Sequence, residues 1–304
     1  MTDSSARGVY VAALTPMNDD LSPNHAAFAS HCRWLLASGA DGLAVLGTTG
    51  EANSFSVDER LALLDALGEA GIPGRALLPG TGTCAIPDTV TLTRKALELG
   101  AAGVVMLPPF YYKGVGDDGL FAAYSEVIER VGDDRLRVYF YHFPAQSNVP
   151  ISHDLIERLL KVYPTAIAGI KDSSGDLSNM LAMCERFPGF GVFAGSEQFL
   201  LPVLRAGGAG CISATANVTV AACAEIYRQW QKEEAGRLQE GLTAQRLAIQ
   251  SQALVPALKQ IMARHSGDQS WIKIRPPLMP LAAEQAKSLF DALDATGFSL
   301  ARAA

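Results

Sequence analysis

One lysine stands at the end of an apolar run and is placed to do covalent chemistry. The run covers residues 167–170, Lys171 follows it, and the polar segment 172–176 comes next. An apolar run with β-branched residues and a glycine indicates a buried strand, so we expect Lys171 at the rim of a core. Loss of water there favours the neutral amine, which attacks a carbonyl carbon. Lys171 is therefore a candidate nucleophile. The alternative is a strand-end lysine that reaches solvent or pairs with Asp172.

A catalytic lysine of this kind needs groups that move protons and hold a substrate. A tyrosine is suited to relay a proton while an iminium serves as the electron sink, and Tyr141 ends another apolar run. The loop 47–50 reads Gly-Thr-Thr-Gly and offers hydroxyl and backbone N–H donors for a carboxylate. Each group also has a structural interpretation, the loop as a simple turn and Tyr141 as a strand tyrosine bonded to a carbonyl. For His142 we expect packing or rim polarity rather than catalysis.

Composition limits the partners. The 304 residues are 49% hydrophobic and carry a formal net charge of -6. No basic stripe is present to neutralise phosphates, which argues against nucleic acid and anionic membranes. No stretch has the length of a membrane span, and residues 1–7 lack the apolar segment of a signal peptide. We expect a soluble, cytoplasmic protein that acts on a small molecule.

The cysteines and acidic residues do not indicate a cofactor. The five cysteines are scattered and show no CxxC spacing, so they predict neither a disulfide framework nor a zinc site. No cluster of histidine, aspartate and glutamate has the spacing of metal ligands. We therefore expect chemistry without a metal or cofactor.

The elements that must position these residues alternate along the chain. Apolar runs predict strands at residues 9–14, 42–47, 76–80, 103–107, 137–141, 167–171, 192–195 and 211–214. Helical patterns lie between Pro23 and Gly39, after a capping box at 56–59, and near 89–99, 119–131, 153–162, 176–187, 199–206 and 220–230. About eight strand–helix alternations predict an α/β fold of the (β/α)8 TIM barrel type, with a doubly wound sheet as the alternative.

Two further helical patterns follow the barrel. They cover residues 236–264 and 282–295 and are separated by the segment 274–278. We expect residues 1–230 to form the barrel and residues 231–304 to form a C-terminal helical appendage packed on it.

Active sites of TIM barrels lie at the carboxyl ends of the strands. We therefore expect one bowl to contain Thr48, Thr49, Phe110, Tyr111, Tyr141 and Lys171. Tyr111 also has the simpler interpretation of a rim aromatic residue.

Several motifs, taken together, resemble the dihydrodipicolinate synthase / N-acetylneuraminate lyase family of class I pyruvate-dependent aldolases. They are Gly47-Thr48-Thr49-Gly50-Glu51, Pro109-Phe110-Tyr111-Tyr112, Tyr141-His142-Phe143-Pro144, Gly169-Ile170-Lys171-Asp172 and Gly195-Ser196-Glu197. Their order matches the family from about Val9 past Asn217. The resemblance implies a (β/α)8 barrel with a C-terminal helical region, a homotetramer built as a dimer of dimers, and catalysis without cofactor or metal.

The resemblance also implies roles for individual residues. Lys171 matches the Schiff-base lysine and Tyr141 the proton relay that also stabilises the substrate carboxylate. Tyr111 matches the tyrosine that reaches the neighbouring subunit's site. The remaining matches are Thr48 and Thr49 for the carboxylate and the relay hydroxyls, Gly47 in the same loop, and Ile212, whose backbone faces the substrate.

One departure bears on the substrate. The synthases carry an arginine, which binds the distal carboxyl end of aspartate semialdehyde, where this chain has Gln146. A neutral amide cannot form the bidentate carboxylate pair. The chain therefore looks more like the N-acetylneuraminate lyase or 2-keto-3-deoxygluconate aldolase branch, and we expect a fragment that bears hydroxyls. The expected hydroxyl partners are Glu197, Gln198 and Ser213.

Other functions stay open. If Lys113 or Arg275 supplies the missing cation, the chain is a 4-hydroxy-tetrahydrodipicolinate synthase that condenses pyruvate with aspartate semialdehyde. The same iminium also supports a 2-oxo acid dehydratase or deaminase. A non-catalytic protein that binds 2-oxo acids is the alternative from another class.

Overall fold

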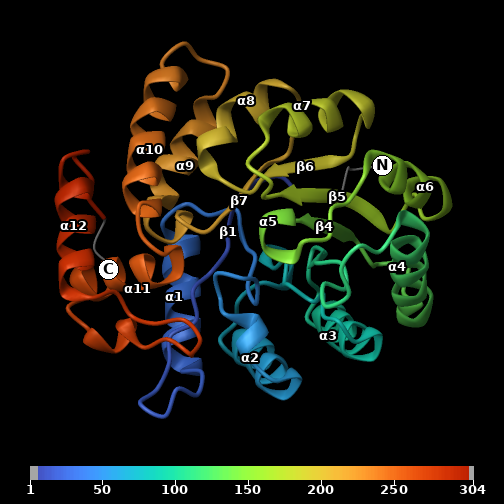
Figure 1. Ribbon diagram of the computed structural model, residues 1–304, viewed down its shortest axis with the longest axis horizontal. Coiled ribbons are helices and arrows are strands. Elements are labelled where there is room, and N and C mark those ends of the chain that lie inside the picture. The colour runs from blue at the N-terminus through green and yellow to red at the C-terminus, as the bar shows by residue number, and fades with distance from the viewer. Residues whose placement is uncertain (1–5, 301–304) are drawn as a thin grey trace.

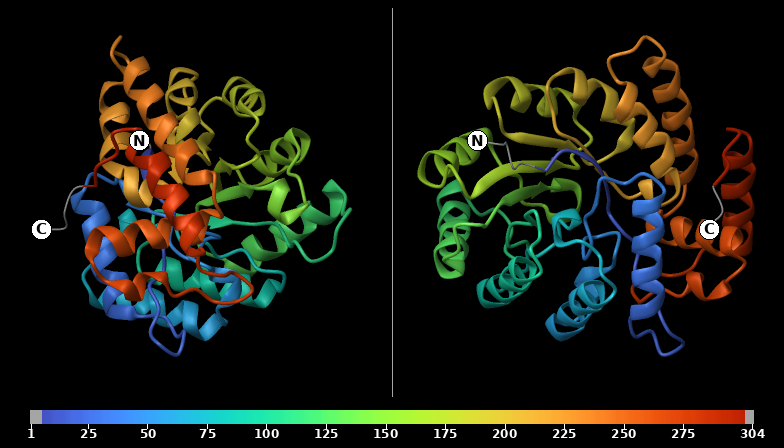
Figure 2. Two further views of the ribbon diagram at one scale, coloured as in Figure 1. Left: turned by 60° about the vertical axis from the view of Figure 1, so that its left-hand side comes forward. Right: turned by 180° about the vertical axis from the view of Figure 1, so that it is seen from behind.

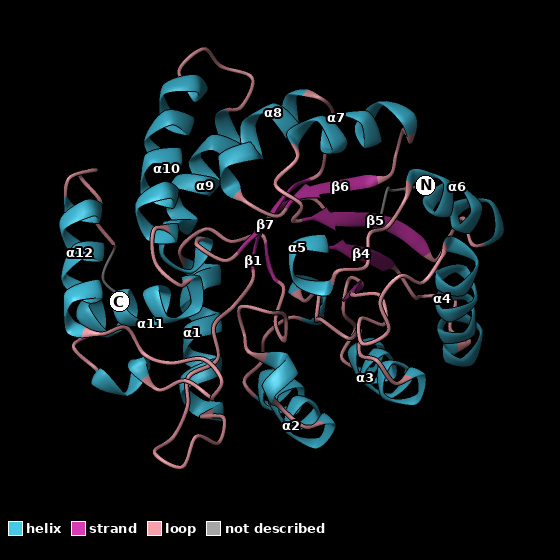
Figure 3. Cartoon of the chain, in the orientation of Figure 1, coloured by secondary structure: helices cyan, strands magenta, loops and turns pink. Residues whose placement is uncertain are grey.

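The computed structural model describes residues 6–300, so residues 1–5 of the N-terminal segment 1–7 lie outside the described residues, and with them most of the expectation that no signal peptide is present. Seven strands form one parallel sheet in the order β2-β1-β7-β6-β5-β4-β3. The strands are β1 (Gly8–Val11), β2 (Gly42–Leu43), β3 (Val104–Met106), β4 (Val138–His142), β5 (Ile167–Asp172), β6 (Gly191–Ala194) and β7 (Gly210–Ser213). Figure 3 shows them at the centre of the molecule, surrounded by helices.

The predicted strand at 76–80 is not a regular strand, although it occupies the expected place. Leu77 pairs with Leu43 of β2, and Gly80 pairs with Val105 of β3. Pro79 lies between these bridges and has no N–H to donate, so a continuous ladder cannot form. The segment nevertheless bridges the two edge strands, and it closes the sheet into a barrel.

Helices cover the outside of the barrel (Figures 1 and 2). They are α1 (His25–Ala37), α2 (Val57–Glu69), α3 (Ile86–Glu98), α4 (Asp117–Val131), α6 (His153–Val162), α7 (Leu177–Arg186), α8 (Leu200–Arg205) and α9 (Ala216–Gln229). The short helix α5 (Pro144–Ser147) lies instead over the centre of the barrel in Figure 1. The short 3₁₀ helices are η1 (Ala52–Ser54), η2 (Gly74–Ala76), η3 (Glu197–Phe199) and η4 (Gln269–Ile272). The predicted capping box is confirmed, because the side chains of Ser56 and Glu59 each accept a hydrogen bond from the other's backbone N–H.

The C-terminal region contains α10 (Ala235–Gln250), α11 (Leu254–Ser266) and α12 (Ala283–Asp294). The prediction of one helix over 236–264 was wrong, because the first helix ends at Gln250 and a second begins at Leu254. Pro256 lies in the first turn of α11, and its ring would clash with the carbonyl of Gln252 if the helix continued. Figure 1 shows the three helices at one flank of the barrel. The boundary at residue 230 stays a prediction.

Large aromatic side chains fill the barrel interior. Tyr10 and Tyr139 each contact Phe193 edge to face, with ring centroids 5.7 Å apart. Ile212 and Leu78 belong to the same buried cluster. A filled interior leaves space for a ligand at the carboxyl ends of the strands. Among the helices of residues 6–300, none is long and apolar enough to cross a membrane.

Candidate active site

Lys171 and Tyr141 lie side by side inside the barrel mouth. They are register partners on β5 and β4, and paired residues of adjacent parallel strands point to the same face. Lys171 is 5% exposed, and its Nζ lies 4.0 Å from the centroid of the Tyr141 ring. The strand pairing therefore holds the amine against the aromatic ring.

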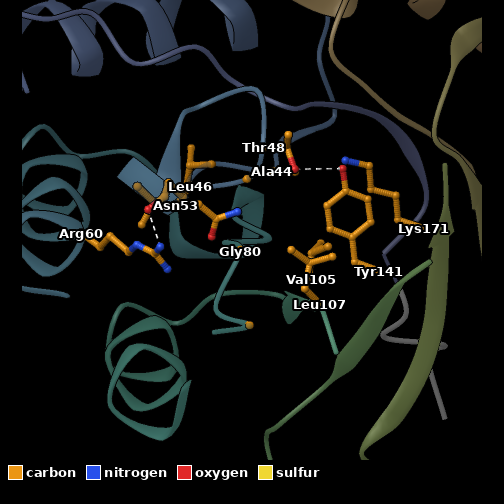
Figure 4. A pocket seen from close by; sticks show the side chains of 14 residues that line it. Ala44, Leu46, Thr48, Asn53, Arg60, Gly80, Val105, Leu107, Tyr141 and Lys171 are labelled. Carbon is orange, nitrogen blue, oxygen red and sulfur yellow. Dashed lines mark hydrogen bonds between the residues drawn. The ribbon is translucent and has the colours of Figure 1, made fainter. Parts of the chain in front are cut away.

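Thr48 lies next to Tyr141 and adds a second hydroxyl group beside the lysine. Its Oγ1 lies 3.4 Å from the Tyr141 hydroxyl, and either oxygen could be the donor. Figure 4 shows Thr48, Tyr141 and Lys171 gathered at one side of the pocket. The amine, the phenol and the alcohol thus form a contiguous set that can pass a proton.

The loop that carries Thr48 and Thr49 has a constrained backbone. Leu46 and Glu51 both adopt left-handed conformations, with φ of 57° and 58°. A Cβ on Gly50 would lie 2.9 Å from the carbonyl oxygen of Ala13, just after β1, so a larger residue would push the loop away from this segment. The loop packs closely on the barrel and presents its hydroxyls at a fixed position.

A buried ion pair ties this loop to the C-terminal region. Glu51 Oε1 lies 2.5 Å from Lys259 Nζ, and both side chains are buried. Burial lowers the pKa of Lys259, while the Glu51 carboxylate raises it. Lys259 also donates to the Lys273 carbonyl at 2.6 Å, and Arg275 N donates to Glu51 Oε2 at 3.0 Å. The C-terminal region therefore helps to position the loop that carries Thr48 and Thr49.

Asp172 does not pair with Lys171. Its Oδ1 accepts from Ser174 N at 2.8 Å, and its Oδ2 accepts from Asn179 Nδ2 at 2.7 Å. Adjacent strand residues point to opposite faces, so the carboxylate turns away from the amine. This geometry does not support the alternative interpretation, in which Lys171 is a strand-end lysine that pairs with Asp172.

His142 turns to the same side as Asp172 and serves packing. Its Nδ1 accepts a hydrogen bond from Ile151 N at 3.1 Å. Burial lowers the pKa of His142, while the nearby Asp172 carboxylate raises it. The neutral ring therefore anchors the segment that follows α5.

A cavity of about 620 Å³ opens above the lysine. Its lining includes Thr48, Thr49, Tyr141, Gln146 and Lys171. The volume is within the range of small-molecule sites, about 300–1,000 Å³. A narrower pocket below it shares Thr48, Tyr141 and Lys171 with the cavity, and it also includes Gly47. Figure 4 shows Arg60 reaching this narrower pocket from the side away from Lys171.

Several predicted site residues lie outside the cavity lining, namely Phe110, Tyr111, Glu197, Ile212 and Ser213, and Gly47 lines only the narrower pocket. Tyr111 is 73% exposed and contacts Tyr112 edge to face, with ring centroids 5.4 Å apart. Ile212 is fully buried in the barrel interior, so its side chain is not available to a ligand. The sequence predicts that the backbone of Ile212 faces the substrate and that Tyr111 reaches the site of a neighbouring subunit. Both stay predictions.

The structure does not support Glu197 as a hydroxyl-binding residue. Its side chain is fully buried, and its carboxylate accepts hydrogen bonds from Ser213, Thr215 and Thr219. This network also engages the Ser213 hydroxyl, and both side chains are buried outside the cavity lining, so they face the protein interior in this structure. Gln198 does line the cavity.

The two candidate cations also lie elsewhere. Lys113 donates to the carbonyls of Phe110 and Ser147. Arg275 pairs with Glu59, and its ring-facing guanidinium lies 4.7 Å from the centroid of Phe55. Neither side chain lines the cavity.

Sequence reasoning missed residues of α10. Arg246 and Gln250 line the cavity, although they lie beyond the last strand of the barrel. Their spacing of four residues places them on one helix face, which was the signal available in the sequence. Among the described residues, no three histidine, cysteine, aspartate or glutamate side chains converge as ligands for a metal ion.

Comparisons with known proteins identify the family of the chain. The model of the dihydrodipicolinate synthetase family matches residues 5–296. A protein of Chloroflexus aurantiacus described as an uncharacterized DapA-like lyase is 32% identical over 289 residues, 93% of this chain and 94% of the relative. The 4-hydroxy-tetrahydrodipicolinate synthase of Listeria welshimeri is 32% identical over 266 residues, 84% of this chain and 86% of the relative.

A solved structure shows the same fold. Dihydrodipicolinate synthase from Agrobacterium tumefaciens is 29% identical, with a TM-score of 0.89 over 95% of this chain and 99% of that chain. A parallel barrel with a buried lysine at its mouth is compatible with a lyase of the class I aldolase type. The chain belongs to the dihydrodipicolinate synthetase family. The predicted family resemblance, α/β barrel fold and enzyme class are thus confirmed.

Proposed function

We propose that Lys171 forms an iminium with C2 of pyruvate or of a related 2-oxo acid. The observation that carries the proposal is the buried amine of Lys171, 4.0 Å from the Tyr141 ring, at the base of the cavity. The hydroxyl pair of Tyr141 and Thr48, 3.4 Å apart, supplies the proton relay. A binding protein would have no need of a relay beside the lysine.

The reaction follows from these groups. The neutral amine attacks the C2 carbonyl, and loss of water from the carbinolamine gives the iminium. The iminium then withdraws electrons from C3, so that a bond at C3 breaks or forms through an enamine. Tyr141 and Thr48 move the protons for the dehydration and for C3, and the loop 47–50 with Thr49 holds the carboxylate.

Deuterium exchange tests this step without knowledge of the second substrate. Enamine formation releases a proton from C3, so the methyl group of pyruvate should exchange with D₂O in the presence of the protein. Proton NMR follows the loss of the methyl signal. Exchange no faster than in buffer alone would contradict the proposal.

Gln146 supports a choice between the branches of the family. It lines the cavity and offers a neutral amide at the position where the synthases carry their arginine. Neither Lys113 nor Arg275 lines the cavity, and the cationic Arg246 enters it from α10, a different place in the fold. We therefore favour a 2-oxo-3-deoxy sugar acid or a related hydroxy-oxo acid, as in the N-acetylneuraminate lyase or 2-keto-3-deoxygluconate aldolase branch. The dehydratase and deaminase alternatives share the same iminium.

The alternative is synthase activity, which the name of the Listeria relative suggests. A kinetic screen separates the two. It compares aspartate semialdehyde plus pyruvate with a panel of 2-oxo-3-deoxy acids, the latter followed by pyruvate release. A kcat/KM for the semialdehyde about a hundredfold above every sugar acid, equivalent to about 2.7 kcal/mol, would establish the synthase.

The assembly belongs to the same proposal. Tyr111 projects from the exposed loop before α4, where a second copy of the chain could receive it. We propose a homotetramer, built as a dimer of dimers, in which Tyr111 completes the neighbouring subunit's relay. A cytoplasmic location stays a prediction.

A further inference from the structure

The cavity contains one positively charged side chain besides the nucleophile. Among the described residues that line the cavity, only Lys171 and Arg246 are cationic. Arg246 is 9% exposed, so the guanidinium group lies largely out of bulk water. A hydrogen bond from a charged, desolvated group to an anion is stronger than one between neutral groups.

Arg246 is held in one orientation by its neighbours. Its Nη1 donates to Thr215 Oγ1 at 3.0 Å. The same nitrogen lies 3.3 Å from Glu197 Oε2 and from Ser213 Oγ. Its Nε donates to Gln250 Oε1 at 2.9 Å. No described residue accepts a hydrogen bond from Nη2, which leaves that nitrogen for a ligand.

The contact with the Glu197 carboxylate does not use all the hydrogen-bond donors of the Arg246 guanidinium group. It already accepts from three hydroxyls, those of Ser213, Thr215 and Thr219. The carboxylate is therefore solvated by the protein, and its contact with Arg246 fixes the plane of the guanidinium group. Fixed donors lose little conformational entropy when they bind a ligand.

The barrel also fixes the helix that carries Arg246. Gln239 Nε2 donates to the Glu197 carbonyl at 3.0 Å, and Gln239 Oε1 accepts from Leu201 N at 3.0 Å. Gln239 and Arg246 are seven residues apart, close to two helical turns of about 3.6 residues each, so they share one face of α10. The contacts of Gln239 therefore set the position of Arg246 at the cavity.

We propose that Arg246, with Gln250 beside it, binds a carboxylate at the end of the substrate remote from the iminium carbon. The proposal rests on the proposed function, since the Lys171 iminium fixes the other end of the substrate. The neutral Gln146 and Gln198 suit hydroxyls along the chain between the two ends. The substrate class is then a hydroxylated 2-oxo acid with a second carboxylate at its far end.

Matched pairs of simple 2-oxo acids test this anchor. One member of each pair is a 2-oxo dicarboxylate, namely 2-oxoglutarate, 2-oxoadipate or 2-oxopimelate. The other is the monocarboxylate of the same chain length, with a methyl group in place of the distal carboxylate. Reductive trapping on Lys171 gives an apparent Kd for each acid, and pyruvate is trapped in parallel. We expect a preference of about tenfold or more for at least one dicarboxylate.

The variants Arg246→Gln and Arg246→Lys locate the source of that preference. Arg246→Gln should reduce it to about one, and Arg246→Lys should leave an intermediate value, because a lysine binds a carboxylate through one point of contact. The matched control is Arg228→Gln on α9, which removes an exposed arginine paired with Glu225. The preference of the control should equal that of the wild type.

Pyruvate trapping separates the possible failures. If the wild type does not trap pyruvate, the proposed function fails. If it traps pyruvate but shows no preference, or if Arg246→Gln keeps the preference, the inference is wrong. Arg246→Gln leaves the buried Glu197 carboxylate without its cation, so a variant that no longer traps pyruvate is replaced by Glu197→Gln/Arg246→Gln, in which both charges are absent. Retained preference in that double variant would overturn the proposal.

Discussion

In the proposed mechanism, proton transfer at the lysine depends on one pair of hydroxyl groups, those of Tyr141 and Thr48. Tyr141→Phe removes the phenol that lies 3.4 Å from Thr48 Oγ1 and keeps the ring beside Lys171. We expect pyruvate methyl exchange to slow by about a hundredfold, because a positioned acid–base group contributes about 10²–10⁴ in rate. The lysine stays in place, so reductive trapping should continue at a lower rate. NMR and mass spectrometry give the two readings.

The control for this change lies on the same strand. Tyr139 precedes Tyr141 by two residues, and its hydroxyl accepts from Ala6 N at 2.7 Å, away from the cavity lining. Tyr139→Phe removes the same atom and should exchange pyruvate protons at the wild-type rate. Equal slowing in both variants would mean that loss of a buried hydroxyl harms the fold, and that Tyr141 has no special role.

The sequence supports predictions for residues that end regular strands. Lys171 and Tyr141 follow apolar runs, and parallel strands end at a common edge, so their proximity could be predicted. Glu197 lies in the three-residue helix η3, which is too short for a hydrophobic pattern to predict the direction of its side chain. In the structure this side chain faces the protein interior. Arg246 is 75 residues beyond Lys171 in the numbering, and only the packing of α10 brings it to the cavity.

At the scale of elements, the ion pair of Glu51 and Lys259 joins the catalytic loop to α11. Lys259→Met leaves a buried carboxylate without its partner, and we expect the free energy of unfolding to fall by about 3–5 kcal/mol. The loop that carries Thr48 should also loosen and bind pyruvate more weakly. Urea denaturation measures the first effect, and the apparent Kd of trapping measures the second.

A double variant shows whether the pairing itself matters. Glu51→Gln/Lys259→Met removes both charges, so no buried charge is left alone, and stability should recover most of the loss. A double variant whose loss equals the sum of the two single losses would show that the two side chains act independently.

A second contact joins α1 to the C-terminal region through His31, and this residue makes the stability of the fold depend on pH. His31 Nε2 donates to Asn217 Oδ1 at 2.8 Å, and this oxygen also accepts from Leu14 N. The His31 ring contacts Trp271 of η4 edge to face, with ring centroids 4.9 Å apart. Burial lowers the pKa of His31 to about 4, against the opposing effect of the Asn217 hydrogen bond.

As the pH falls, His31 is therefore protonated in the unfolded chain at a higher pH than in the folded protein. As pH falls from about 6.5 to about 4, protonation of the unfolded state removes about 3 kcal/mol of stability, and the contribution of His31 is constant below that window. Urea denaturation at several pH values should show the loss. His31→Gln keeps a donor for Asn217 and should lose less stability across the same window. Parallel curves for the two proteins would contradict the assignment.

Most elements could be predicted because their patterns are regular. Apolar runs located the strands, and helical spacing located α6 at its observed residues. The failures have local causes. Pro79 removes a donor from the predicted third strand, and Pro256 forces a new start for α11. The helix α5 was missed because its four residues are too few to show a helical period.

At the scale of the whole molecule, the exposed pair of Tyr111 and Tyr112 tests the assembly. The two tyrosines are adjacent and equally exposed, at 73% and 74%. If Tyr111 completes the relay of a neighbouring subunit, Tyr111→Phe should slow pyruvate exchange by about tenfold or more. Tyr112→Phe is the matched control and should keep the wild-type rate. Light scattering that finds a fully active monomer would end this proposal.

The iminium on Lys171 is the central claim, and reductive trapping tests it most directly. The protein is incubated with saturating pyruvate, treated with borohydride, digested and analysed by mass spectrometry. The chemistry predicts one reduced pyruvate adduct per chain, located on Lys171, and no adduct in Lys171→Arg. An unmodified Lys171 in the trapped wild-type protein, or an adduct on another lysine, would contradict the account.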